Sequence, residues 1–262
     1  MKKLLVSLLC FMMTLGITNV KAEETLSGWV TAGKYQNYYV DGEKVTNKLM
    51  EIDGKYYYFD RHGTMRNNTV KVGKTTYYLS KKGVLLMRKV GKAAYYDHTN
   101  KRIDYWDGYE YETVERAKKI VARITKPSDS MATKRLKAFK WVEKFNYKTR
   151  RRFSFKKGWI ALYANDHFLK PSDGDCRSDA CAFAYLAYVI GYKDVRVCCS
   201  SRKLTGKNHA FTEINGRVYD PLFAQAASFK RNYNVTYKTY FTSKAIDFKI
   251  PYSQVARYAK NQ

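Results

Sequence analysis

Four copies of one short aromatic motif in the first 106 residues constrain the fold more than any other feature. Each copy contains a Gly-Lys pair that is followed within five residues by paired aromatic side chains. The pairs begin at Gly33, Gly54, Gly73 and Gly91, so successive copies lie 21, 19 and 18 residues apart. A regular period of about 20 residues is typical of repeated supersecondary units that stack on their neighbours.

Each copy predicts a β-hairpin. A further glycine follows the aromatic residues in three copies, at Gly42, Gly63 and Gly83, and glycine supplies the positive φ of a tight turn. Neighbouring tyrosines point to opposite faces of a strand because side chains alternate. One hairpin cannot bury its apolar face alone. We therefore expect residues 23–106 to form an all-β solenoid of short hairpins.

This region resembles the cell-wall-binding repeats of Gram-positive surface proteins, of the choline- or glucan-binding type. The resemblance covers roughly residues 26–103 and rests on the period, the Gly-Lys-x-x-Tyr-Tyr core and the glycine turn. Choline-binding members enclose a quaternary ammonium group between Trp and Tyr rings, but Gly28-Trp29 is the one Gly-Trp pair here. The implied ligand is therefore an anionic or glycan cell-wall polymer. In the alternative interpretation the tyrosines only form the core of the solenoid.

Residues 1–22 predict a signal peptide. A short basic start precedes an apolar run of 14 residues, Leu4 to Ile17, which fits a signal-peptide core and is shorter than the ~20 residues of a spanning helix. Val-Lys-Ala at 20–22 is close to the small-x-small cleavage pattern. We therefore expect a secreted, cell-surface protein with no stable membrane span. A retained N-terminal anchor is the alternative.

The chain is strongly basic, with 49 Lys and Arg against 23 Asp and Glu and a formal net charge of +26. Residues 107–262 carry a net charge of +17 and residues 23–106 a net +6. Such a field attracts polyanions. For an exported protein these are wall polymers, anionic lipid surfaces and acidic proteins, and export argues against a specific nucleic-acid partner. The densest cluster, Lys148–Arg152, is interpreted as a solvated basic loop.

After Arg102 the pattern changes, and residues 107–262 predict a separate α+β domain. Residues 104–111 are interpreted as an aromatic linker. Apolar residues at helical spacing predict four helices, over about 112–124, 130–145, 160–168 and 176–190. Strands are expected over 195–199, 209–214 and 217–222, the last two joined by an Asn-Gly turn. Strand or loop is expected from about Phe223 onward.

Cys176 begins the clearest of these helices, directly after a glycine-containing turn. Backbone N–H groups and the helix dipole favour the thiolate there, and the N–H groups can donate to an oxyanion. Four cysteines remain once Cys10 is removed, too few for a disulfide scaffold. Cys181 is interpreted as helix packing, with a disulfide to Cys198 or Cys199 as the alternative.

Pairing the last two strands across their Asn-Gly turn puts His209 and Asp220 on one face. His209 then faces Leu222 and Phe211 faces Asp220, so the diagonal pair lies roughly 7–8 Å apart at the backbone. Asp220 would hold the imidazole in one tautomer and favour its charged form, as the third member of a triad does. The alternatives are a polar strand end for His209 and a turn former for Asp220.

Three motifs in order resemble the transglutaminase-like superfamily. They are Gly-Asp-Cys opening a small-residue helix that ends in Ile-Gly-Tyr, then His-Ala-Phe-Thr-Glu, then Tyr-Asp-Pro, over about residues 110–225. The resemblance implies a papain-like fold with Cys176 as nucleophile, His209 as general base and acid, and Asp220 as the orienting residue. Two departures are Phe211 in place of the commoner Trp, and Cys-Cys-Ser-Ser at 198–201 where many relatives have a glycine.

These features together predict an exported, wall-associated cysteine enzyme that acts on amide bonds of a protein or peptide substrate through an acyl-thioester. Water as the acceptor makes it a peptidase or amidase, which family analogy favours, and a lysine amine makes it a cross-linking transamidase. A papain-like peptidoglycan peptidase is the rival enzyme, and a non-catalytic wall-binding or adhesion protein is the other alternative. With four His and no CxxC or HExxH pattern, we expect no metal and no cofactor.

Overall fold

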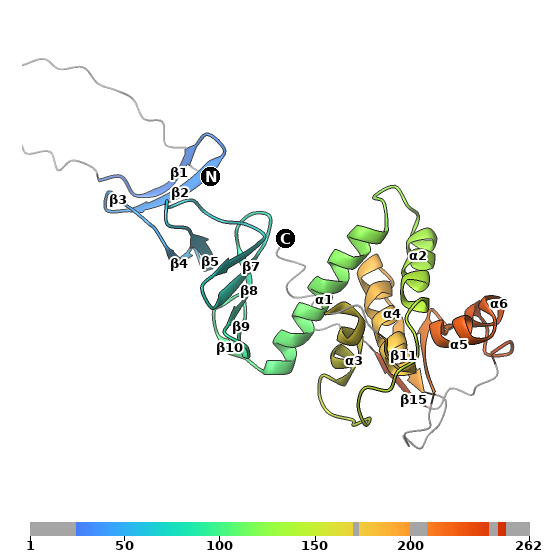
Figure 1. Cartoon of the computed structure of the whole chain (residues 1–262). Coiled ribbons are helices and arrows are strands. Elements are labelled where there is room, and N and C mark those ends of the chain that lie inside the picture. The colour runs from blue at the N-terminus through green and yellow to red at the C-terminus, as the bar shows by residue number, and fades with distance from the viewer. Residues whose placement is uncertain (1–24, 170–172, 200–208, 241–245, 250–262) are drawn as a thin grey trace, which may run out of the picture.

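The computed structural model describes residues 25–169, 173–199, 209–240 and 246–249. Over these residues the chain combines several small antiparallel sheets with helices, in agreement with the predicted mixture of hairpins and an α+β part. The hairpins come first and the helices follow (Figure 1). The predicted signal peptide lies outside the described residues. None of the described helices is long and apolar enough to cross a membrane.

The repeats form three antiparallel sheets. The first contains β1 (Gly28–Ala32), β2 (Tyr35–Val40) and β3 (Glu43–Lys44), and the second contains β4 (Lys48–Ile52) and β5 (Lys55–Phe59). The third contains β6 (Thr69–Val72), β7 (Thr75–Leu79), β8 (Leu85–Val90), β9 (Ala94–Tyr96) and β10 (Arg102–Ile103). The glycines of the Gly-Lys pairs lie in the tight turns β1–β2, β4–β5, β6–β7 and β8–β9, and the later Gly42 and Gly83 lie between the paired strands β2–β3 and β7–β8, as predicted.

Two of the later glycines, Gly63 and Gly83, also let one unit pack on the one before it. A Cβ at Gly63, whose φ is +76°, would lie 3.1 Å from the carbonyl oxygen of Val45 in the preceding unit. A Cβ at Gly83, whose φ is +82°, would lie equally close to the carbonyl oxygen of Arg66. Glycine is therefore required at both positions by the positive φ and by the close approach of backbone. This contact repeats from unit to unit, as expected of stacked hairpins.

Helix α1 (Tyr105–Ile124) joins the repeats to the rest of the chain. The predicted aromatic linker over 104–111 is wrong, because all but the first of these residues belong to this helix. Asp104 caps the helix by accepting a hydrogen bond from the Trp106 N–H. Gly108 lets the Tyr95 ring lie against the helix, since a Cβ there would come within 2.1 Å of that ring. The last hairpin therefore packs directly on α1.

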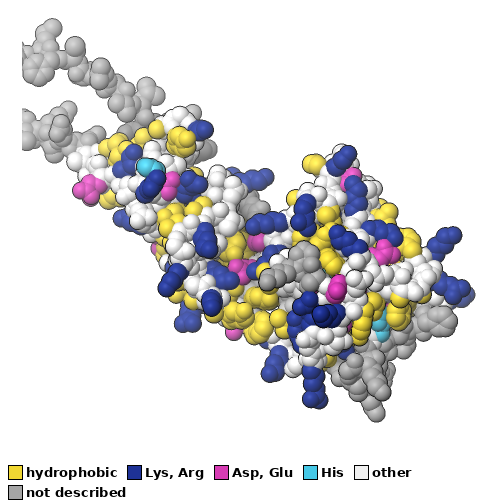
Figure 2. All heavy atoms as spheres, in the orientation of Figure 1, with side chains coloured by type: hydrophobic (Ala, Val, Ile, Leu, Met, Phe, Trp, Pro, Cys, Tyr) yellow, Lys and Arg dark blue, Asp and Glu magenta, His cyan; other side chains and the backbone are white. Residues whose placement is uncertain are grey.

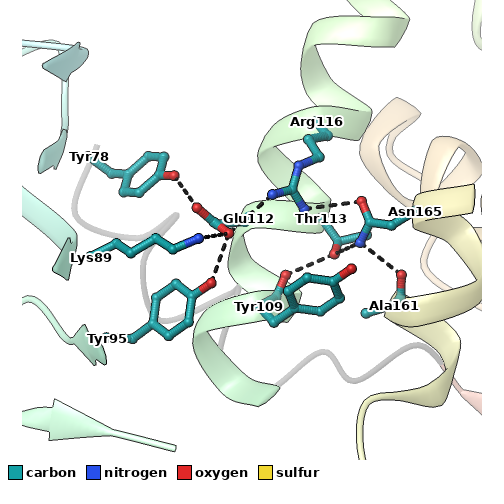
Figure 3. A network of polar contacts seen from close by, with 9 residues as sticks. All are labelled: Tyr78, Lys89, Tyr95, Tyr109, Glu112, Thr113, Arg116, Ala161 and Asn165. Carbon is teal, nitrogen blue, oxygen red and sulfur yellow. Dashed lines mark hydrogen bonds and ion pairs between the residues drawn. The ribbon is translucent and has the colours of Figure 1, made fainter. Parts of the chain in front are cut away.

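Glu112 of α1 is the polar centre of this contact (Figure 3). Its carboxylate accepts hydrogen bonds from the hydroxyls of Tyr78 at 2.7 Å and Tyr95 at 2.8 Å, and from Lys89 Nζ at 2.8 Å. It also pairs with Arg116 at 3.1 Å. Burial alone would raise the pKa of Glu112, but the hydrogen bonds from Lys89, Tyr78 and Tyr95 outweigh it and the pKa is lowered. An ionised carboxylate thus ties the two parts together.

The C-terminal part is built around helix α4 (Cys176–Ile190), in which every residue up to Ala187 is buried. Helices α1, α2 (Met131–Glu143) and α3 (Trp159–Phe168) pack around α4, which also covers two strands of a five-stranded sheet. The sheet order is β14 (Tyr233–Val235), β13 (Arg217–Tyr219), β12 (Ala210–Ile214), β11 (Val195–Cys199) and β15 (Ile246–Lys249). Most of the buried residues of these elements form one large apolar core, and a second, smaller cluster contains Cys198, Phe211, Val218, Val235 and Tyr240.

The helix and strand predictions hold in this part as far as Tyr219. Ser130 caps α2, and Gly191 ends α4 with a φ of 119°. The hairpin has the predicted register, with Ile214 opposite Arg217 and Thr212 opposite Tyr219. The predicted helices over 130–145, 160–168 and 176–190 correspond to α2, α3 and α4.

Beyond Tyr219 the predictions are wrong in part. The strand expected to reach Leu222 ends at Tyr219, because Asp220 caps a short helix, α5 (Pro221–Ala226). A proline at the first helical position favours such a start. A second short helix, α6 (Phe229–Asn232), precedes β14. The strand or loop expected after Phe223 is therefore a pair of helices followed by two strands that complete the sheet.

Candidate active site

Cys176 is the first residue of α4 and is 6% exposed. The preceding Asp175 caps the helix and accepts hydrogen bonds from the N–H groups of Arg177 at 2.9 Å and Ser178 at 3.2 Å. The position of the cysteine is therefore the predicted one. The N–H groups of Arg177 and Ser178 are therefore engaged by the carboxylate of Asp175.

His209 and Asp220 meet, as the hairpin register predicts. His209 Nε2 lies 2.5 Å from Asp220 Oδ2. The contact arises by a different route from the expected diagonal of two strands, because Asp220 has left the sheet and caps α5. Its Oδ1 accepts from the Phe223 N–H at 3.0 Å, and its Oδ2 also accepts from the Tyr240 hydroxyl at 2.6 Å. The fully buried carboxylate thus has a fixed orientation.

The imidazole of His209 is held from three directions. Its Nε2 contacts Asp220, its face stacks on the Phe223 ring at 3.9 Å between centroids, and it hydrogen-bonds to the side chain of Cys176. Burial alone would lower the pKa of His209, but the hydrogen bonds to Asp220 and Cys176 outweigh it and raise the pKa to about 9. The ring therefore keeps its proton at neutral pH and places a cation beside the sulfur of Cys176.

The turn before Cys176 is fastened by the basic segment 148–152. The carbonyl of Gly174 accepts a hydrogen bond from the Lys148 N–H at 2.7 Å, and Arg150 Nε donates to the carbonyl of Asp173 at 2.7 Å. The interpretation of this segment as a solvated loop is therefore incomplete. Part of it positions the turn from which Cys176 projects.

A buried polar layer supports the same turn and was not identified from the sequence. Arg151 pairs with Asp166, whose carboxylate also accepts from Ser178 Oγ at 2.5 Å. His167 Nε2 lies 2.8 Å from Asp179 Oδ1, and both residues are buried. Burial, which outweighs the contact with His167, raises the pKa of Asp179 to about 6. The available sequence signal was a pair of adjacent polar residues within each of two otherwise apolar helices, Asp166-His167 in α3 and Ser178-Asp179 in α4.

Among the described residues, Cys176, Cys181, Cys198 and Cys199 form no disulfide, and all four are buried. Phe211 is fully buried and contacts the Tyr240 ring, with 4.9 Å between centroids, so it packs behind the residue that supports Asp220. Ser200 and Ser201, part of the second departure from the family pattern, lie outside the described residues. No group of side chains in the described part of the chain has the makeup of a metal site.

A cavity of about 720 Å³ adjoins the triad on the side of Asp220. It is lined mainly by apolar groups of α5, α6 and the segment that ends at Tyr240. Phe223 and Tyr240 belong both to this lining and to the contacts of His209 and Asp220. Neither residue carried a sequence signal, because their roles depend on where the chain turns after β13 and β14.

The repeats present a second group of candidate residues. Trp29, which is 40% exposed, lies edge-on to Tyr38 at 5.1 Å and to Tyr57 at 5.0 Å between ring centroids. These rings belong to the first two units. In the last units, Tyr78 and Tyr95 are engaged by Glu112 instead. The rings that remain accessible for a ligand therefore include those at the N-terminal end of the repeats.

No protein-family model matches the chain, and the search of curated proteins found no match. Among solved structures, the choline binding domain of Spr1274 from Streptococcus pneumoniae is 26% identical over 23% of this chain and 71% of its own, with a TM-score of 0.21. The modular Cpl-1 endolysin complexed with a peptidoglycan analogue is 19% identical over 30% of this chain and 31% of its own, with a TM-score of 0.23.

CbpJ from Streptococcus pneumoniae TIGR4 is 18% identical over 30% of this chain and 27% of its own, with a TM-score of 0.23. The chain thus spans less than a third of both CbpJ and the endolysin. Similarities with such scores do not establish a common fold or activity for the whole chain.

Proposed function

We propose that this protein is an exported, wall-associated cysteine enzyme that cleaves amide bonds of peptides or proteins. The observation that carries the proposal is the hydrogen-bonded series of Cys176, His209 and Asp220, in which the cysteine begins a helix and the carboxylate is fully buried. The same residues carry the sequence resemblance to the transglutaminase-like superfamily. A papain-like arrangement of α4 and the sheet is part of this proposal.

Each residue has one role in the proposed reaction. The sulfur of Cys176 attacks the amide carbonyl carbon, His209 donates its proton to the departing amine, and an acyl-thioester remains. His209 then accepts a proton from water as the water oxygen attacks the thioester, which releases a carboxylic acid and restores Cys176. Asp220 keeps the imidazole oriented and stabilises its charged form, and the Tyr240 hydroxyl holds Asp220.

Wall attachment is assigned to the repeats, at a cell surface of the Gram-positive type. The partly exposed ring of Trp29 beside Tyr38 and Tyr57 supports this assignment, because aromatic faces stack on sugars and attract cations. An anionic or glycan wall polymer is the proposed ligand. The catalytic part would then act on peptides or proteins near the wall.

Thiol alkylation near pH 6, read by peptide mass spectrometry, tests the catalytic proposal. An unperturbed thiol titrates near ~8.5 and reacts slowly at that pH. Labelling of Cys176 is expected to be fast, and slow in a His209→Ala variant, while the buried Cys181 and Cys199 serve as internal controls. Slow labelling of all four thiols in the native protein would contradict the enzyme and favour a non-catalytic wall-binding protein.

A second assay separates hydrolysis from cross-linking. A glutamine-containing peptide is incubated with the enzyme in the presence of a fluorescent primary amine. Hydrolysis is expected to exceed incorporation of the amine, which would identify a peptidase or amidase. Predominant incorporation would identify a transamidase with the same nucleophile.

A further inference from the structure

A second concave site lies between α1, α2 and α3 and does not include the triad. It is a cavity of about 400 Å³. Three basic side chains of α1, Arg116, Lys119 and Arg123, line one side of it, and Trp141 and Phe168 line another. We call this site the α1 groove. Neither the proposed reaction nor the proposed wall attachment of the repeats uses it.

The three cations lie on one face of α1, because their spacings of three and four residues place them one above the other. At 1.5 Å of rise per residue they extend over roughly 10 Å. Arg116 is engaged by Glu112 and by the side chain of Asn165. Lys119 and Arg123 are exposed and form no ion pair within the described part of the chain. Two positive charges therefore face the groove without a neutralising carboxylate.

The floor of the groove is apolar and buried. Ile120, Trp141 and Phe168 are each less than a tenth exposed, and Leu169 at the rim is 54% exposed. His167 also lines the groove, and its hydrogen bond to Asp179 joins it to α4. A ligand that fits must therefore carry negative charges at intervals along a line. The surface of the ligand between these charges must be less polar, so that it can lie on the apolar floor.

We propose that the α1 groove binds a linear phosphate-bearing polymer. Successive phosphates lie along Arg116, Lys119 and Arg123, and the links between phosphates lie over the apolar floor. Arginine and lysine are both suited to phosphate, since guanidinium matches its oxygens in pairs and ammonium acts as a point charge. The net charge of +17 over residues 107–262 attracts such a polymer from a distance. Figure 2 shows that Lys and Arg side chains greatly outnumber Asp and Glu on the visible face of this part.

The location of the groove on α1 gives the proposal a consequence for the whole molecule. The same helix carries Glu112, which binds the last sheet of the repeats through Tyr78, Lys89 and Tyr95 (Figure 3). The groove and the repeats are therefore presented by one connected unit. Two contacts to the same wall raise the apparent affinity through effective concentration.

Binding of short inorganic polyphosphate to the full mature chain tests the proposal. The groove variant combines Lys119→Gln with Arg123→Gln. The control variant combines Lys118→Gln with Lys126→Gln, which removes the same charge; Lys118 instead pairs with Glu115 at 2.8 Å. The groove variant is expected to bind about fivefold more weakly, and its slope of log affinity against log salt is expected to fall by about 1 to 2 units. The control variant keeps the slope of the native chain.

An equal loss in both variants would overturn the proposal, because it would show that the overall charge acts without a defined site. No loss in the groove variant would overturn it as well. Vesicles of phosphatidylglycerol and phosphatidylcholine form the second arm. Tighter binding of the native chain to these vesicles than to polyphosphate at equal phosphate concentration would show that the groove serves a membrane instead. Alkylation of Cys176 is expected to be the same in both variants, so this test is independent of the enzyme.

Discussion

The repeats and the C-terminal part bury their aromatic residues in hydrophobic clusters of very different size. In the repeats, buried side chains form small separate groups, such as Val45, Ile52 and Phe59. In the C-terminal part, one large core connects α1 to α4 and the sheet, and a smaller cluster contains Phe211 and Tyr240. The stability of each hairpin therefore depends on its immediate neighbours. The stability of α4 depends on the three helices and the sheet that pack against it.

The comparison explains why the two candidate functions lie where they do. A stack of small clusters leaves rings such as Trp29 partly exposed, so a ligand can reach them. The C-terminal part instead holds a buried carboxylate, Asp220, within hydrogen-bond distance of His209, and the Tyr240 that donates to Asp220 belongs to its smaller cluster. The proposed binding uses rings that the repeats leave partly exposed, and the proposed chemistry uses the fixed geometry of the packed C-terminal part.

The largest expected effect separates these functions by substitution. Asp220→Asn keeps a side chain that can cap α5 but removes the charge beside His209. We expect kcat/KM for amide hydrolysis to fall about 10³- to 10⁴-fold, or roughly 4–5.5 kcal/mol, with wall binding unchanged. Tyr57→Ala is the corresponding variant in the repeats. We expect it to bind purified walls more weakly and to hydrolyse a small peptide as the native chain does. Loss of both functions in either variant would contradict the separation.

The next effect tests the two kinds of core. Phe183 of α4 is fully buried, and Phe183→Ala is expected to destabilise the C-terminal part by about 3–5 kcal/mol. Hydrogen exchange read by mass spectrometry would then show faster exchange throughout α4 and the sheet. Phe59→Ala, at an equally buried position of the repeats, is expected to accelerate exchange only in the units next to it. Uniform acceleration over the whole chain in both variants would mean that the molecule has one core.

Substitution of Glu112 tests whether the repeats and the C-terminal part unfold separately, because this residue joins them. Glu112→Ala leaves Lys89 and the hydroxyls of Tyr78 and Tyr95 without their shared acceptor. We expect a loss of about 2–4 kcal/mol, seen as separate thermal transitions of the two parts. Glu115→Ala, which removes only a half-buried ion pair with Lys118, is expected to cost less than about 1 kcal/mol. Unchanged cooperativity in Glu112→Ala would show that apolar contacts alone hold the junction.

The pH dependence of the junction follows from the same residue. The pKa of Glu112 is lowered in the folded protein, so its contribution to stability is present above the unfolded value of about 4.3 and is lost as the pH falls through the folded value. Acidification below about pH 4 should therefore separate the two transitions in the native chain. It should have no such effect in Glu112→Ala.

The sequence predicted the elements whose signals are local. The Gly-Lys period predicted the hairpins, and Asn215-Gly216 predicted a register that brings His209 toward Asp220. It did not predict the start of α1 at Tyr105, because an aromatic-rich segment resembles a linker until Tyr95 is seen against Gly108.

Nor did the sequence reveal Phe223 and Tyr240 in the site. The proline after Asp220 ends the strand early, and the chain turns through α5 and α6 before it returns to Asp220. Such contacts depend on packing between segments about 20 residues apart rather than on a local pattern.

The smallest expected effect concerns tyrosine itself, which both parts use in quantity. In the C-terminal part the hydroxyl matters: Tyr240→Phe removes the hydrogen bond to Asp220 and should lower kcat about 2- to 10-fold, or 0.5–1.5 kcal/mol, with KM unchanged. Tyr237→Phe, whose hydroxyl donates to Glu213 at 2.5 Å, is the matched control and should leave kcat unchanged. In the repeats only the ring should matter, so Tyr57→Phe should bind walls as the native chain does. If Tyr57→Phe loses wall binding, the repeats recognise their ligand through hydrogen bonds, and the contrast between exposed rings and buried hydroxyls no longer holds.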